Sequence, residues 1–249
     1  MVTAYPVAGK KKSFDLCLAF IKGCGGQIAG GRLRDGPAVF YGVDQSNDSI
    51  WRDVLASGHD WYYIDNSYFD AARQQRFRVS RNRLQHSGWG KSNGERFRAL
   101  GIPIQPWRTT GRHIVVCPQS DAFMKLLAGR SGHWGRQTVE ELQRSTGREV
   151  RLRPWLRDKG CSSATLAQDL IGAHALVTWS SAAAVTAVLA GIPVIVRASD
   201  CAARPMSGTE LEALPTPDRQ TWAGVLADNE WTVKELTDGT AWRALNENS

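Results

Sequence analysis

Short apolar runs and helix-like segments alternate through the second half of the chain. Residues 175–196 predict a buried strand, a polar turn, an apolar helix, a Gly-Ile-Pro corner and a second buried strand. Both strands are apolar on both faces, which is typical of a parallel sheet covered by helices. Further strands are predicted at His113–Cys117 and Val150–Leu152, and helices at Gln137–Ser145 and Ser163–Ile171.

The first half shows the same alternation. Ser49–Ser57 predicts a helix with Asp48 or Ser49 as its cap and Gly58 as its end. Arg76–Ser80 alternates polar and apolar positions, which favours an exposed or edge strand. Other strands are predicted at Phe14–Phe20, before a glycine-rich turn at 22–26, and at Pro37–Val43 and Trp61–Asp65.

This order of elements predicts an α/β fold of two Rossmann-like lobes, with parallel sheets that face a cleft. Gly101–Gly111 contains two prolines and is the expected linker. The expected domains are an N-terminal lobe at 1–108, a C-terminal lobe at 109–216 and a helical tail at 217–249.

Composition limits the class of protein. The 249 residues are 42% hydrophobic, which is enough for a sizeable core. No leader and no apolar run of membrane-spanning length is visible, so we expect a soluble, cytoplasmic protein without a membrane partner. Five cysteines and five histidines are widely scattered, so no metal site and no tightly bound cofactor is expected. The sequence does not specify whether the protein forms oligomers.

The net charge of +7 is concentrated in one segment. Residues 73–98 contain eight basic residues and one acid, which suggests a polyanionic partner, with DNA first. A solvated charged face is the alternative. Trp107 lies beside this segment, and an aromatic ring there could stack on a base. The residues expected to contact DNA are Arg73, Arg76, Arg78, Arg81, Arg83, Trp89 and Lys91.

The turn after the strand at 175–178 carries three hydroxyl side chains, Thr178, Ser180 and Ser181. Hydroxyls and unpaired amides at the start of a helix favour anions. The carboxyl edge of a doubly wound sheet is also where such folds bind ligands. These residues therefore predict a phosphate-binding site, with simple N-capping by serine as the alternative.

This segment resembles the nucleotide-sugar half of GT-B glycosyltransferases, most closely the capsule-polysaccharide type. The resemblance covers about residues 114–206, and Val150-Arg-Leu-Arg-Pro154 matches a strand end where that family has a basic residue and a proline. Trp155 stands where the family usually has histidine. The resemblance implies that Arg153, Ser180 and Ser181 contact the donor diphosphate, with Ser120 at the neighbouring strand end.

A second segment, Trp61–Phe69 followed by Arg76–Arg83, resembles the acceptor-side catalytic loop of the same family and glycosyltransferase-like proteins of tailed bacteriophages. The tail at 229–242 resembles the end of those phage proteins. Asp65 ends a predicted strand, where an enzyme would place the base that deprotonates an acceptor hydroxyl. A cap of the next turn is the alternative role, and the weaker candidates for a base are Asp44, Asp60 and Asp70.

Together these features predict a glycosyltransferase that uses a nucleotide-sugar, with UDP-glucose favoured, as co-substrate. The expected acceptor is a 5-hydroxymethylpyrimidine, such as 5-hydroxymethylcytosine, in phage DNA. Two alternatives stay open: a cytoplasmic transferase that builds a surface polysaccharide, and a non-catalytic module that binds nucleotide or DNA. Preorganised charge at the serine turn, with Arg153, would stabilise the leaving group without a metal ion.

Overall fold

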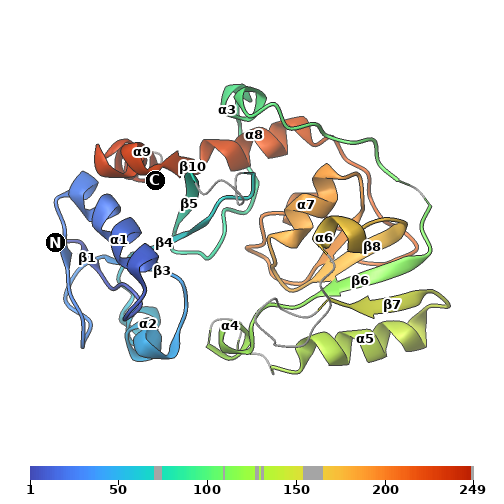
Figure 1. Cartoon of the computed structure of the whole chain (residues 1–249), viewed down its shortest axis with the longest axis horizontal. Helices are drawn as coiled ribbons and strands as arrows, with labels where there is room; N and C mark the ends of the chain where they lie inside the picture. The colour runs from blue at the N-terminus through green and yellow to red at the C-terminus, as the bar shows by residue number, and fades with distance from the viewer. Residues whose placement is uncertain (70–74, 109, 127–128, 130–131, 154–164, 248–249) are drawn as a thin grey trace. The chain divides into compact units, whose positions relative to one another are not determined.

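The computed structural model describes residues 1–69, 75–108, 110–126, 129, 132–153 and 165–247. The chain divides into two compact units (Figure 1). Unit 1 comprises residues 1–86 and 226–249, and unit 2 comprises residues 87–225. The expected domain boundaries after residues 108 and 216 both fall inside unit 2.

Unit 1 is built on a mixed sheet. Among the described residues the strand order is β10 (Glu230–Thr232), β5 (Arg76–Arg81), β4 (Trp61–Asn66), β3 (Ala38–Tyr41), β1 (Thr3–Ala4) and β2 (Gln27–Ile28). One strand, β5, runs antiparallel to both of its neighbours, β4 and β10, and the other three strand pairs are parallel. The predicted parallel sheet is thus present in this unit, with antiparallel pairing added at β5.

Successive strand residues point to opposite faces of this sheet, and apolar residues occur on both faces. Helices therefore cover both faces. Val39 packs in one core with Phe20 of α1 (Lys11–Cys24) and with Leu236 of α9 (Val233–Thr237). On the other face the ring of Phe40 stacks on Trp51 with centroids 4.0 Å apart. The elements that complete this unit are η1 (Gln45–Asn47), α2 (Asp48–Ser57), which carries Trp51, and α10 (Thr240–Glu247).

The predicted strand at Phe14–Phe20 is wrong, because these residues lie in helix α1. The buried positions include Leu16, Cys17, Phe20 and Ile21, which recur with the three-to-four-residue spacing of a helix. Phe14 is 46% exposed, so the apolar run does not lie on one buried strand. A seven-residue segment with six apolar residues fits either structure, and the tertiary packing of α1 decides between them.

The prediction of an exposed or edge position for Arg76–Ser80 is also wrong. β5 lies between β4 and β10, and the residues from Phe77 to Ser80 are buried. β10 comes from the C-terminal tail, which was expected to be helical only. The hydrogen bonds of β5 are therefore completed by a strand about 150 residues away in the sequence.

Unit 2 contains a parallel sheet, as predicted. The consecutive residues Ile114 and Val115 point to opposite faces of the sheet, and both are fully buried because α5 covers one face and α7 the other (Figure 1). Among the described residues the strand order is β7 (Glu149–Leu152), β6 (His113–Cys117), β8 (Ala173–Thr178) and β9 (Val194–Val196). The helices are α3 (Glu95–Ala99), α4 (Asp121–Leu126), α5 (Trp134–Ser145), α6 (Leu166–Asp169), α7 (Ala183–Leu189) and α8 (Gln220–Asp228), which runs into unit 1, with the short η2 (Arg204–Met206).

None of the helices in the described part of the chain combines the length and apolar character that a membrane span requires.

Candidate active site

Three charged residues lie side by side across the sheet of unit 1. The strand register places Asp65 of β4 opposite Arg78 of β5, and Arg78 opposite Glu230 of β10. Directly opposed residues project to the same face of a sheet, so the three side chains form an acid–base–acid sequence. We refer to Asp65, Arg78 and Glu230 as the charged row. With all three groups ionised, its net charge is −1.

Arg78 is the centre of this row. It is 8% exposed, and its Nη2 donates to Oδ2 of Asp65 in a close ion pair. The guanidinium carbon lies 4.4 Å from the centre of the Tyr68 ring, within cation–π distance. Burial disfavours the charged form, but Asp65, Tyr68 and Tyr63 outweigh it, so the pKa of Arg78 is raised. Arg78 is therefore a fixed positive charge beside Asp65.

Glu230 closes the other end of the row. It is fully buried and accepts hydrogen bonds from Ser67 Oγ at 2.5 Å and from the Tyr68 amide at 2.5 Å. Burial raises the pKa of Glu230, while these two donors and Arg78 act in the opposite direction. Because Glu230 also holds the loop that follows β4, it fixes the position of Tyr68 above Arg78.

Asp65 is the member of the row that remains open to solvent. Its side chain is 26% exposed, and Oδ1 accepts the amide proton of Asn66 at 2.7 Å. Lys12 Nζ donates to Asn66 Oδ1 at 2.7 Å, and burial lowers the pKa of Lys12 while Asp65 opposes that change. A carboxylate with this exposure and orientation retains acceptor positions for the proton of an incoming hydroxyl group.

In unit 2, the predicted donor residues gather at the carboxyl edge of the sheet, but several have structural partners. Thr178 Oγ1 donates to the Cys117 carbonyl at 2.5 Å and thereby ties β8 to β6. Ser180 is 3% exposed, and its Oγ accepts a hydrogen bond from Gln119 at 3.0 Å. Ser181 is half-buried, and its Oγ accepts the amide of Ala183 at 3.3 Å in the turn that leads into α7.

Ser120 and Arg153 lie at the two neighbouring strand ends. Ser120 Oγ accepts the amide of Phe123 at 3.3 Å in the first turn of α4. Arg153 follows β7, and its Nη1 donates to the carboxylate of Asp169 in a close ion pair. The three strand ends thus bring Ser120, Arg153 and Ser181 to one edge, where the positive charge of Arg153 is already balanced by an acid.

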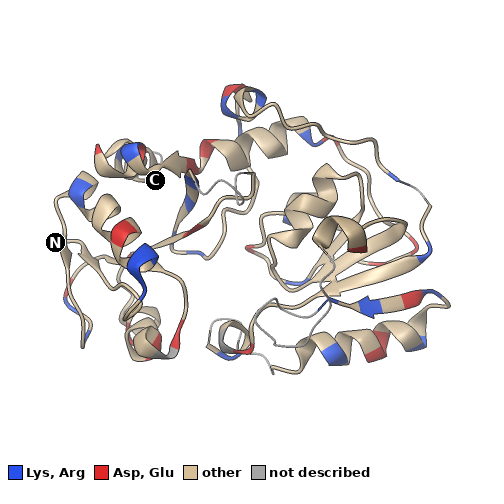
Figure 2. Cartoon of the chain, viewed as in Figure 1, with Lys and Arg blue, Asp and Glu red and all other residues tan. Residues whose placement is uncertain are grey.

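The basic segment is less uniformly cationic on its surface than its sequence suggests. Arg78 belongs to the charged row, and Arg81 pairs with Asp60 at 2.7 Å. Arg76 is half-buried and Arg83 is exposed. In unit 2, Trp89 is 64% exposed and Lys91 is exposed, and both signs of charge occur on nearby α3 (Figure 2). Arg73 lies outside the described residues.

The weaker acidic candidates have other roles where they are described. Asp44 accepts the Ser46 amide at 3.1 Å and caps η1, and Asp60 pairs with Arg81. Asp70 and Trp155 lie outside the described residues. In the described ranges, no group of three or more His, Cys, Asp and Glu is placed to hold a metal ion.

The sequence predicted Asp65 as a candidate base and Arg78 as a DNA contact, but it did not bring the two together and did not include Glu230. Glu230 contacts residues more than 160 positions earlier in the chain, so no local pattern relates it to Asp65. Tyr68 and Arg78 were present in the segments that resemble the catalytic loop. The alternation of β5 placed Arg78 on the same face as Ser80, but the pairing with Asp65 required the antiparallel register.

No protein-family model matches the chain, and no curated protein matches it by sequence. Several solved structures match it, and two of them do so across nearly all of the chain. The beta Kdo 2,7 transferase of Thermosulfurimonas dismutans KpsC has a TM-score of 0.53 at 11% identity, with 100% of this chain and 99% of that chain covered. The beta Kdo 2,4 transferase of the same KpsC has a TM-score of 0.54 at 12% identity, covering 93% and 92%.

At these identities the likeness establishes the fold. Both units of this chain are α/β and together have the fold of the KpsC transferases, which supports the resemblance to the capsule-polysaccharide type. Neither matched structure is described as a DNA-modifying enzyme of bacteriophages.

Proposed function

We propose that this chain is a glycosyltransferase that moves a sugar from a nucleotide-sugar to a hydroxyl group of a surface-polysaccharide acceptor. The observation that carries the proposal is the likeness to two Kdo transferases along almost the whole length of both chains. Because the match covers both units, the likeness is not limited to one domain that the two proteins share. Fold alone does not define chemistry, so the residues at each site must supply the rest of the argument.

Unit 1 supplies the base in this proposal. Asp65 accepts the proton of the acceptor hydroxyl as its oxygen bonds to the anomeric carbon of the sugar. The bond from that carbon to the nucleotide phosphate breaks at the same time, and the phosphate leaves with the electron pair. Arg78 holds the carboxylate in place, and the partial exposure of Asp65 leaves it accessible to a hydroxyl group.

Unit 2 supplies the donor site. Ser120, Ser181 and Arg153 come from three adjacent strand ends, at the edge where doubly wound sheets bind nucleotides. Thr178 and Ser180 hold the neighbouring strand ends together at this edge through their hydrogen bonds to Cys117 and Gln119. Arg153 adds positive charge near the phosphate, moderated by Asp169.

The donor and acceptor are the finer parts of the proposal. Because both similar structures are Kdo transferases, activated Kdo is the first donor to test, beside the UDP-glucose that the sequence favoured. Hydroxymethylated DNA stays the second acceptor, supported by the exposed Arg83, Trp89 and Lys91. Against it, Arg78 and Arg81 are engaged by Asp65 and Asp60.

The test is a donor screen followed by a transfer assay. Thermal unfolding with UDP-, GDP-, ADP- and CMP-sugars, including activated Kdo, identifies the donor by the stabilisation that ligand binding causes. The donor found is then incubated with Kdo-containing oligosaccharides or with DNA that carries 5-hydroxymethylcytosine, and products are measured by mass spectrometry. Transfer to the oligosaccharide supports the proposal, transfer to DNA selects the second acceptor, and donor binding without transfer to any acceptor favours a binding module.

Asp65→Asn tests the base directly. It keeps the shape of the side chain but removes the carboxylate, so kcat should fall by roughly 100- to 10,000-fold, the usual contribution of a general base. The donor-induced shift in unfolding temperature should stay unchanged, because the donor residues lie in unit 2. Asp44→Asn is the matched control, and its kcat should remain close to that of the parent. An Asp65→Asn variant with full activity would exclude this carboxylate as the base.

A further inference from the structure

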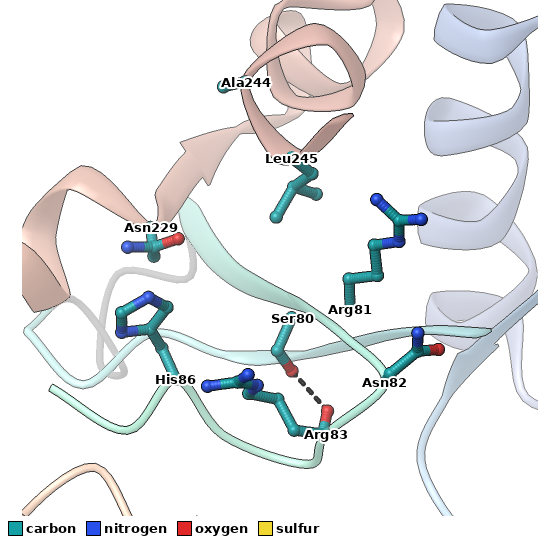
Figure 3. A pocket seen from close by; sticks show the side chains of 8 residues that line it. All are labelled: Ser80, Arg81, Asn82, Arg83, His86, Asn229, Ala244 and Leu245. Atoms are coloured by element: carbon teal, nitrogen blue, oxygen red, sulfur yellow. Dashed lines mark hydrogen bonds between the residues drawn. The ribbon is translucent and has the colours of Figure 1, made fainter. Parts of the chain in front are cut away.

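A cavity lies at the carboxyl end of β5. It has a volume of about 450 Å³ and belongs entirely to unit 1 (Figure 3). Ser80 of the lining is two residues from Arg78, and Asn229 directly precedes Glu230. The cavity therefore adjoins the charged row, but its described lining includes none of Asp65, Arg78 and Glu230. Its lining includes Arg81, Arg83, His86, Asn229, Ala244 and Leu245.

A rigid turn carries the polar side of this cavity. Asn82 has a left-handed backbone with φ of 54°, and its Oδ1 accepts the Trp61 amide at 2.8 Å. Its Nδ2 donates to Asp60 at 2.5 Å. Ser80 Oγ donates to the Arg83 carbonyl at 2.7 Å, as Figure 3 shows. These bonds fix the backbone from which Arg83 extends, so little ordering of the turn is needed when a ligand binds.

The charge of the cavity is positive. Two arginines contribute to its lining, and the lining includes no carboxylate among the described residues. Asp60, which lies outside the lining, pairs with Arg81 at 2.7 Å. Burial, and then Arg83, lower the pKa of His86 to about 4, so His86 is a neutral imidazole at physiological pH.

The lining also has an apolar side, formed by Ala244 and Leu245 of α10. Arginine forks match the geometry of phosphate and carboxylate groups, and Asn229 adds an amide. Ligand pockets usually have volumes of about 300–1,000 Å³, so this cavity has room for a sugar ring with its charged substituent.

We propose that this cavity binds an oxyanion-bearing sugar, either a phosphate ester or a sugar carboxylate. It binds the ligand without reacting with it, because Asp65 is not among the residues that line the cavity. If the proposed function holds, the occupant is a charged residue of the acceptor glycan remote from the attacking hydroxyl. The binding itself does not depend on that function.

The test measures binding to the full chain without any donor. Glucose 6-phosphate, glucuronate and neutral glucose are titrated at low salt by calorimetry, while the side-chain signals of His86 are followed by long-range ¹H–¹⁵N NMR. Low ionic strength is chosen because the screening length is about 10 Å at 0.1 M salt. We expect at least one anion to bind and to shift the His86 signals, and glucose to bind far more weakly.

Arg83→Gln is the decisive variant, because Arg83 is exposed and its replacement leaves the turn intact. It should weaken anion binding by about tenfold or more, equivalent to 1.4 kcal/mol. Arg32→Gln, at another exposed arginine of unit 1, should bind like the parent. Preference for glucose 6-phosphate or for glucuronate identifies the source of the oxyanion.

Three results would overturn the proposal: no binding of either anion, equal binding of glucose, or unchanged affinity in Arg83→Gln. None of them concerns transfer. A chain that binds the anion but transfers no sugar would keep this site and reject the proposed function.

Discussion

Arg78 supplies the positive charge between two carboxylates, so its removal should be costly. Arg78→Gln leaves Asp65 and the buried Glu230 without their counter-charge, and breaking a buried pair in this way costs about 3–5 kcal/mol. We expect the free energy of unfolding, measured by urea denaturation, to fall by that amount. Most of this loss of stability comes from leaving two acids without a counter-charge, and less comes from the stabilisation that the ion pair itself provides.

Arg76→Gln is the matched control for Arg78→Gln, since Arg76 lies two residues earlier on β5 and is half-buried. It should change the free energy of unfolding by no more than about 0.5 kcal/mol. Equal effects of the two variants would contradict the central role of Arg78. Arg78→Lys separates charge from geometry, because lysine keeps the charge but lacks the guanidinium fork.

His86 predicts a dependence of stability on pH. Its pKa in the folded protein is about 4, against an ordinary value of 6.5, because burial and then Arg83 disfavour the imidazolium. Below pH 6.5 the unfolded chain therefore binds a proton that the folded chain does not. The stabilisation is complete above pH 6.5 and is lost as the pH falls towards 4, by about 3 kcal/mol in total.

The His86→Gln variant lacks this proton, so its unfolding free energy should fall less than that of the parent between pH 7 and pH 4. Urea denaturation at several pH values measures the difference. NMR titration of the His86 ring provides the direct check, and an ordinary titration near pH 6.5 would refute the assignment.

The parts of the site that the sequence predicted are those that depend on residues close together in the chain. Asp65 was identified because a polar residue that ends a buried strand is a local signal. Glu230 and its bonds to Ser67 and Tyr68 depend on the pairing of β10 with β5, which no local pattern specifies. The structural partners of Thr178 and Ser180 likewise arise from contacts between neighbouring strands.

At the scale of elements, burial explains which predictions succeeded. The strands of unit 2 were predicted because both faces are apolar, as for Leu176 and Val177 of β8, which are fully buried. The prediction for the α1 segment failed because the six apolar residues of Phe14–Phe20 fit either a strand or a helix. β10 is only three residues long and joins α8 to α9, so its strand character comes from its partner β5.

Gly23 allows α1 to pack closely on the turn between α9 and α10. A Cβ at Gly23 would lie 2.1 Å from the Leu236 carbonyl oxygen and 2.8 Å from the Gly239 amide nitrogen. Alanine normally stabilises a helix interior by about 1 kcal/mol relative to glycine. Here the backbone clash should outweigh that gain, so we expect Gly23→Ala to lower the free energy of unfolding by about 1–3 kcal/mol.

Gly30→Ala controls for the substitution itself, because no atom lies within 4 Å of a Cβ at Gly30. Its effect on urea denaturation should stay within about 0.5 kcal/mol. If Gly23→Ala were as stable as Gly30→Ala, α1 would not be packed against this turn as closely as the structure indicates.

At the scale of the whole molecule, the chain leaves unit 1 after residue 86 and returns to it at residue 226. Unit 2 is thus an insertion in the sequence of unit 1. The C-terminal residues contribute to the core of unit 1, where Trp231, Leu236 and Ala241 pack with residues of α1 and the sheet. The domain map predicted from the linker at 101–111 and the order of elements separated this tail from the first lobe, because no local pattern shows that β10 pairs with β5.

A chain that ends at residue 229 tests this dependence. It lacks β10, α9 and α10, so β5 becomes an edge strand and Arg78 loses Glu230. Loss of even one large buried side chain costs about 2–5 kcal/mol, and a whole domain is stable by only about 5–15 kcal/mol. We therefore expect unit 1 to unfold, while unit 2, whose residues 87–225 are all retained, keeps its structure.

Limited proteolysis with mass spectrometry distinguishes the two units in the truncated chain. Peptides from residues 1–86 should be cleaved rapidly, and a fragment close to residues 87–225 should persist, because cleavage follows the population of unfolded chain. A chain that ends at Glu247 removes only two residues and should resist cleavage throughout. If residues 1–86 were protected in the chain that ends at residue 229, the first segment would fold without β10. The pair of Asp65 and Arg78 would then be stable without Glu230.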